Sequence, residues 1–269
     1  MDNSEIISDS IEYARNALVG NWKTWLIFII CSLPFALMVF LFDPEKIKAA
    51  KTIDWSLFPW GQLCALLLAG FLLSFFTTGY LVRVWRGTTP PPEFGDWVSL
   101  FLDGIKVMIV QILWFIPAAV VLCITVVFFV ISFAVNGSAL AMPMRIASLL
   151  LVVIEIALIV LTVLCTIIAL VRYARTGSIR EGIRYSAVME TIRAIGWGSY
   201  IIALIVLLVT AIIFFLVISV IGLIPYIGWV INLALDPLFA VFSARYLSRV
   251  YDSAAPPASP VISGPAEGI

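Results

Sequence analysis

The sequence predicts an all-α membrane protein with about six transmembrane helices. Hydrophobic residues make up 63% of the 269 residues and charged residues only 12%, against roughly 45–50% and 25% in soluble domains. The apolar residues form six long runs, and a helix needs about 20 such residues to cross the hydrocarbon of a bilayer. The basic residues gather between alternate runs, which is typical of chains that cross a membrane several times.

The six apolar runs define the predicted spans, residues 24–42, 60–82, 105–135, 138–171, 199–221 and 224–246. At about 1.5 Å per residue the third and fourth exceed the thickness of the hydrocarbon, so we expect them to tilt or protrude. Gly222, Pro225 and Gly228 favour a tight hairpin between the last two spans over one unbroken helix. We expect residues 1–251 to form one integral membrane domain and residues 252–269, rich in Pro, Ala, Ser and Gly, to form a disordered cytoplasmic tail.

Basic residues predict the orientation of the chain. Twelve of the sixteen lysines and arginines fall on the side that holds both termini and the second and fourth loops. Because cytoplasmic loops carry the excess of Lys and Arg, we expect a multi-pass protein of the cell membrane with both termini in the cytoplasm.

Three stretches between the spans predict short amphipathic helices on the cytoplasmic surface. They are residues 4–19, the stretch with Phe94, Trp97 and Phe101, and the stretch that starts with the capping-box pattern of Ser178 and Glu181. These helices either lie in the membrane surface or pack against the ends of the spans, and the two interpretations are compatible.

The order of these elements predicts a threefold repeat of one surface helix followed by one transmembrane hairpin. Residues 81–86 and 170–175 both read LVRxxR, and each motif closes a span and precedes a predicted surface helix. Arg245 and Arg249 form a looser version at the end of the sixth span. Gly20, Gly104 and Gly196 mark the predicted ends of the three surface helices.

Several of these motifs are similar to those of one protein family, the domain of unknown function 4013. Its first signature resembles Gly79-Tyr80-Leu81-Val82-Arg83 with Gly87, Pro92-Glu93-Phe94, Trp97 and Gly104; its second resembles Arg172-Tyr173-Ala174 with Thr176-Gly177-Ser178; its third resembles Ala244-Arg245-Tyr246 with Tyr251. The resemblance extends over about residues 8–252. It implies an uncharacterised archaeal or bacterial multi-pass membrane protein, and it supplies no activity and no catalytic residue.

Two carboxylates, Glu155 and Asp236, lie deep in predicted spans with no Lys or Arg at similar depth. An unpaired charge there costs roughly 3 kcal/mol by insertion scales, so we expect a neutral or hydrogen-bonded acid. Glu155 shares a helix face with Thr162, and Asp236 shares one with Asn232. Such polar stripes are typical of hydrogen-bonded contacts between helices; a proton or cation path and a polar ligand pocket are the alternatives.

Arg172, Arg175, Arg180 and Arg184 form a basic cluster that is a candidate site for anionic lipid head groups or an acidic partner. Setting the orientation of the chain is the simpler interpretation of the same cluster.

The sequence favours a non-enzymatic function. It has no histidine, a net charge of zero and no recognisable phosphate-binding or zinc motif, so we expect no catalytic, cofactor or metal site and no nucleic-acid partner. The leading hypothesis is membrane organisation, assembly or lipid-surface interaction, with the bilayer and other membrane proteins as partners. A transporter or channel for a small solute, proton or cation, built on the deep carboxylates, is the alternative, and a membrane-embedded lipid enzyme is a weaker third.

Overall fold

The computed structural model describes residues 3–41, 58–224 and 227–254, and these residues form helices with no strand among them. The helices are α1 Asn3–Leu18, α2 Trp22–Leu37 with the 3-10 turn η1 Met38–Leu41, α4 Trp60–Trp85, α5 Trp97–Ala134, α6 Ala141–Thr176, α7 Ile179–Ile183, α8 Tyr185–Ile195, α9 Trp197–Gly222 and α10 Gly228–Asp252. Six of these stretches are long and apolar enough to cross a membrane, and they coincide with the six predicted spans. The chain is therefore an integral membrane protein. Residues 255–269 of the predicted tail lie outside the described residues.

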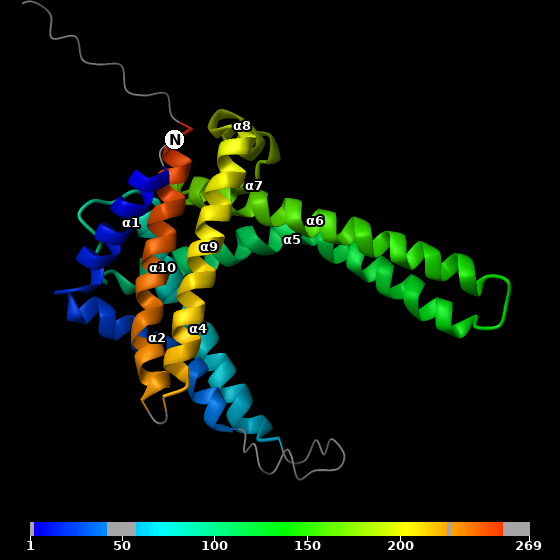
Figure 1. The fold of residues 1–269 in the computed structure, drawn as a ribbon, viewed down its shortest axis with the longest axis horizontal. Helices are drawn as coiled ribbons and strands as arrows, with labels where there is room; N and C mark the ends of the chain where they lie inside the picture. The colour runs from blue at the N-terminus through cyan, green and yellow to red at the C-terminus, as the bar shows by residue number, and fades with distance from the viewer. Residues whose placement is uncertain (1–2, 42–57, 225–226, 255–269) are drawn as a thin grey trace, which may run out of the picture.

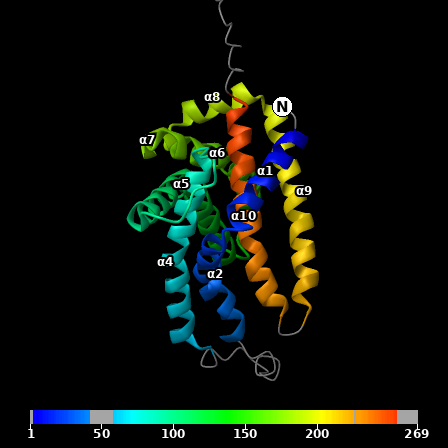
Figure 2. The same cartoon turned by 90° about the vertical axis from the view of Figure 1, so that its left-hand side faces the viewer.

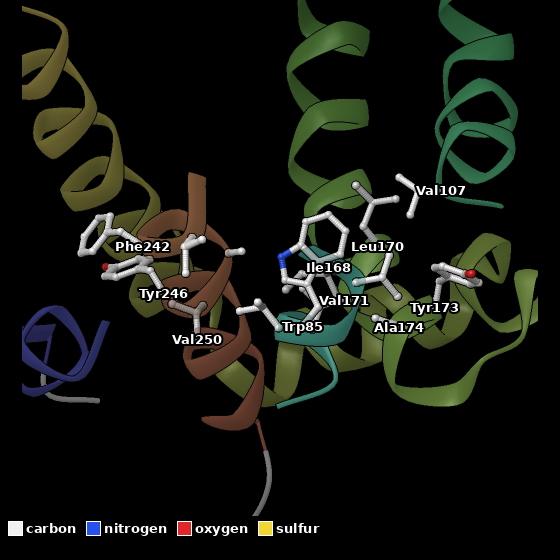
Figure 3. Packing of buried hydrophobic residues seen from close by; sticks show 14 of the residues in the cluster. Trp85, Val107, Ile168, Leu170, Val171, Tyr173, Ala174, Phe242, Tyr246 and Val250 are labelled. Atoms are coloured by element: carbon white, nitrogen blue, oxygen red, sulfur yellow. The ribbon is translucent and has the colours of Figure 1, made fainter. Parts of the chain in front are cut away.

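The six long helices pair into three hairpins, α2–α4, α5–α6 and α9–α10; the first and third lie side by side, and α5–α6 diverges from both (Figures 1 and 2). They meet where α4, α6 and α10 end, and α1, α7, α8 and the start of α5 surround this meeting point, which we call the junction (Figures 1 and 2). The main hydrophobic core lies there. Figure 3 shows Trp85 of α4 among Ile168 and Val171 of α6, with Tyr246 and Val250 of α10 to one side.

The α5–α6 hairpin projects away from the other helices and is held along one seam (Figure 1). Buried residues recur along it every seven positions: Ala118, Thr125 and Ser132 on α5, and Ala141, Ser148, Glu155, Thr162 and Ala169 on α6. A seven-residue period keeps one face of each helix turned toward its partner. Most of these side chains are small, which lets the two backbones approach closely. The 38 and 36 residues of the two helices make them about 57 and 54 Å long.

Two of the three predicted surface helices differ from the prediction. The second is not separate, because residues 97–134 form one continuous helix and Gly104 lies inside it. Gly104 is needed for packing, since a Cβ there would come within 2.2 Å of the Phe75 carbonyl oxygen of α4. The third breaks into α7 and α8 at the extended residue Arg184, and the Ser178 side chain makes no cap hydrogen bond, so the capping-box prediction was wrong. Gly20 and Gly196 do end α1 and α8, with φ of 91° and 88°.

Each hairpin and the surface segment before it form one unit: α1 with α2–α4, the start of α5 with the rest of α5–α6, and α7 and α8 with α9–α10. The contacts between units repeat around the molecule. The start of α5 packs on α4, helices α7 and α8 pack on α6, and α1 and α2 pack on α10. Helix α9 reaches α6 through the Tyr200 hydroxyl, which donates to the Leu164 carbonyl at 2.7 Å. Each surface segment thus covers the closing helix of the preceding hairpin, and α1 completes the ring by covering the last one. Both α1 and α8 bury their apolar faces against the protein, in agreement with the packing interpretation.

Candidate functional site

Charged side chains from all three units meet at the junction. Each closing helix donates an arginine to an acid on the surface segment that covers it. Arg86, the C-cap of α4, lies 2.7 Å from Asp103, Arg172 of α6 lies 2.7 Å from Glu181, and Arg245 of α10 lies 2.8 Å from Asp9. These three ion pairs join each unit to the next around the ring.

The ends of the three closing helices are also bonded directly to one another. Arg175 of α6 donates to the hydroxyl of Ser248, 2.9 Å away, and that hydroxyl donates to the carbonyl of Trp85 at 3.3 Å. Arg86 returns a bond to the carbonyl of Ala174 at 3.3 Å. Ser248 is fully buried, so its hydroxyl needs these partners. The junction is consequently a connected polar network inside an apolar core.

The ion pair that closes the ring joins Arg245 and Asp9. Its arginine is the most buried of the three, with a side chain only 8% exposed. Its guanidinium carbon lies 4.5 Å from the centre of the Tyr13 ring, which is a cation–π geometry. The Tyr13 hydroxyl donates to the Thr88 carbonyl at 2.9 Å, and burial raises the pKa of Tyr13 to about 12. Helix α1 is therefore attached to both α10 and the segment after α4.

Three of the four arginines proposed for lipid head groups are already paired within the chain. Arg172 and Arg184 both bond to Glu181, and Arg175 bonds to Asp252 at 2.7 Å. The hydrogen bond from Arg172 lowers the pKa of Glu181 below its usual value. Arg180 is exposed and has no ion pair within the described part of the chain. The arginine cluster is thus mainly structural at its inner positions.

The two deep carboxylates do not face each other. Glu155 is buried in the α5–α6 seam, whereas Asp236 is exposed on α10. At about 1.5 Å per residue they lie about 31 Å and 24 Å from the junction ends of their helices. Because those helices diverge from the junction, the two groups do not share one site (Figure 1).

The polar seam holding Glu155 is not a chain of bonds between helices. The hydroxyls of Thr125, Ser132 and Ser148 donate to carbonyls three or four residues earlier in their own helices. The Oε2 atom of Glu155 has no hydrogen-bond partner among the described residues. Thr162 is buried two turns further along the same seam. These residues pack closely without bonding across the hairpin, so the hydrogen-bonded interpretation was wrong for the hydroxyls.

Asn232 lies apart from this seam, in the first turns of α10. It is half-buried beside Gly222 of α9, and its Oδ1 atom has no partner among the residues described. It therefore contributes to the α9–α10 turn region and does not join Glu155 in a common pocket.

The acids of the junction are the residues that sequence reasoning missed. Asp9, Asp103 and Glu181 each stand on the packed face of a surface segment, and Asp103 is 5% exposed. The available signal was an acid recurring once per predicted surface helix, close in space to the arginines that end the preceding span.

Comparison with known proteins identifies one family. The model of a family described as protein of unknown function (DUF4013) matches residues 62–223, from the start of α4 to the end of α9. We found no match to the chain among curated proteins or among solved structures.

Proposed function

The chain belongs to the DUF4013 family, and from its geometry we propose that it is a non-enzymatic scaffold that organises the membrane around three hairpins, one of which diverges from the other two. The single observation that carries this proposal is the junction, where a buried hydrogen-bond network joins the closing helices α4, α6 and α10 and three ion pairs fix each of them to the surface segment that covers it. The α5–α6 hairpin leaves this fixed point in a different direction from the other two hairpins, which lie side by side. We expect such a molecule to be wider at one face of the membrane than at the other.

The use of polar groups supports a structural role over a catalytic one. The inner arginines and acids of the junction neutralise one another, and the seam hydroxyls bond within their own helices. The remaining surface of the hairpins is apolar and suited to lipid or to other membrane proteins.

We place the protein in the cell membrane with the junction and both termini on the cytoplasmic side, because the basic residues gather there. Single cysteines at Thr89 and Gly177 should react with an impermeant thiol reagent only from the cytoplasm. A cysteine at Gly137, in the α5–α6 turn, should react only from outside. The same sidedness for Gly177 and Gly137 would contradict this orientation.

The diameter of proteoliposomes that contain the protein tests the scaffold proposal. Wild-type protein reconstituted at increasing density should shift the vesicle diameters measured by electron cryo-microscopy, because a wedge bends the bilayer that it occupies. The matched variant Arg86→Gln, Arg172→Gln, Arg245→Gln keeps all six apolar helices but loses the three ion pairs. At equal insertion it should shift the diameters much less. Identical diameters for the two proteins would refute the proposal.

One observation favours a second candidate, a proton or cation path. The Oε2 atom of Glu155 is buried and without a partner in the described structure, as a transient ion-binding group would be. Dye-loaded proteoliposomes distinguish the two functions. The scaffold predicts no pH-driven flux above that of empty vesicles, whereas a flux abolished by Glu155→Gln would establish transport.

A further inference from the structure

An apolar groove of about 390 Å³ lies between α1, α9 and α10. Both α1 and α9 pack on α10 (Figure 2), and residues of all three helices line the groove. Its wall is largely aromatic, since Phe239 stacks on Phe214 with ring centres 4.8 Å apart and lies 5.9 Å from Phe242. Ile11 of α1 and Val19, which follows α1, are both more than half exposed and line the groove together with Thr210 of α9.

The corresponding places in the other two units are filled by the chain itself. Between the α2–α4 hairpin and the start of α5, Phe94 packs on Phe28 and Tyr80, with ring centres 5.3 and 4.7 Å away. Between the α5–α6 hairpin and α7, Trp114 fills the space and donates to the Gly182 carbonyl at 3.0 Å. On the α1 side the third place is lined by Ile11, Ala14, Arg15 and Val19, with no aromatic side chain to fill it, so it stays open.

One cation lines this open groove. Arg15 of α1 is exposed and has no ion pair within the described part of the chain, in contrast to the paired arginines of the junction. An apolar groove with a single free guanidinium matches a ligand that has a hydrocarbon chain and an anionic head.

We propose that this groove binds one acyl chain of an anionic phospholipid, with Arg15 binding its phosphate. The inference rests on the scaffold proposal only in taking a bilayer as the surroundings of the protein. A lipid suits the groove better than a partner helix does, because an acyl chain covers the apolar wall while its phosphate pairs with the one free guanidinium.

The chain offers a matched control for Arg15. Arg193 of α8 is also an exposed arginine of a surface helix with no ion pair among the described residues, but it does not line the groove. Two further variants test the cavity itself. Thr210→Phe fills it, and the lost hydroxyl bonded only to Val206 of its own helix. Ile11→Trp blocks its mouth at an exposed position where a larger side chain meets no core.

The experiment is native mass spectrometry of purified protein with an equimolar mixture of phosphatidylglycerol and phosphatidylcholine of the same chain length. Wild type should retain one phosphatidylglycerol. Arg15→Gln should weaken its retention about fivefold, the usual effect of one basic side chain near an anionic lipid, and Arg193→Gln should leave it unchanged. Thr210→Phe and Ile11→Trp should reduce retention of both lipids, with thermal unfolding confirming that the variants are folded.

Two results would overturn the site. Equal losses in Arg15→Gln and Arg193→Gln would mean that lipid selection is a diffuse effect of surface charge. Full retention in folded Thr210→Phe or Ile11→Trp would mean that the lipid binds elsewhere. Neither readout depends on vesicle shape, so the lipid site and the scaffold can fail separately.

Discussion

The crossing of α4 and the start of α5 makes a sharp prediction for Gly79. A Cβ built on Gly79 would lie 2.0 Å from the carbonyl oxygen of Leu100 and 2.6 Å from its carbonyl carbon. Both are backbone atoms, so no side-chain rotation relieves the clash and the two helices must separate. The reciprocal contact, Gly104 against Phe75, separates with them.

The expected cost of Gly79→Ala follows from opposing effects. Overpacking of a tight contact typically costs 1–3 kcal/mol, occasionally more, while Ala is favoured over Gly in a helix by roughly 1 kcal/mol. Because the clash is with rigid backbone, we expect the upper end and a net loss of about 2 kcal/mol. For a chain of this size that lowers the melting temperature by roughly 4–8 °C.

Intrinsic tryptophan fluorescence during heating in detergent measures this shift, and Gly61→Ala is the control. Gly61 lies in the same helix, and a Cβ there would meet nothing within 4 Å. Its replacement should leave the melting temperature unchanged or slightly raised. If Gly79→Ala melts at the same temperature as Gly61→Ala, the close α4–α5 crossing is not present and the ring order of the units loses its first link.

Three further predictions follow from individual contacts. Glu155→Leu should leave thermal stability unchanged or raise it, because it removes an expensive group from the seam; a loss above about 2 kcal/mol would reveal a bonding partner. Trp114→Phe should cost about 1 kcal/mol through the lost bond to the Gly182 carbonyl, whereas the same change at the exposed Trp22 should cost nothing measurable. The lowered pKa of Glu181 stabilises the fold above the usual carboxyl pKa, so the melting temperature should fall as pH drops below about 4.5 toward the folded pKa, less steeply in Glu181→Gln.

The six spans could be predicted because a helix that crosses a bilayer needs about 20 consecutive apolar residues, and such runs can be recognised in the sequence. The end of α8 was equally visible, since Gly196 adopts a positive φ that glycine tolerates best. The same reasoning failed at Gly104, where the glycine serves a close contact inside a continuous helix. A glycine's sequence context does not distinguish a backbone turn from a close approach of two helices.

The partners of the polar residues could not be predicted for a related reason. A helical period places Ser148 and Glu155 on one face, and both are indeed buried against α5. It does not decide whether a hydroxyl bonds across to the neighbour or back to its own helix, and Ser148 bonds back. Likewise, Asp236 and Glu155 both lie near the middle of a predicted span, so the sequence does not distinguish them. The arrangement of the hairpins buries Glu155 and leaves Asp236 exposed.

The ring of units closes where α1 packs on α10, and a double-mutant cycle across Asp9 and Arg245 tests that closure most directly. The free energy of unfolding would be measured for wild type, Asp9→Asn, Arg245→Gln and the double variant. Because the Arg245 side chain is 8% exposed and only 2.8 Å from Asp9, we predict that each single change costs about 2–3 kcal/mol and that the double variant costs little more, a coupling of about 1–3 kcal/mol. Losses that simply add would show that the two residues are independent and that this ion pair does not hold α1 to α10.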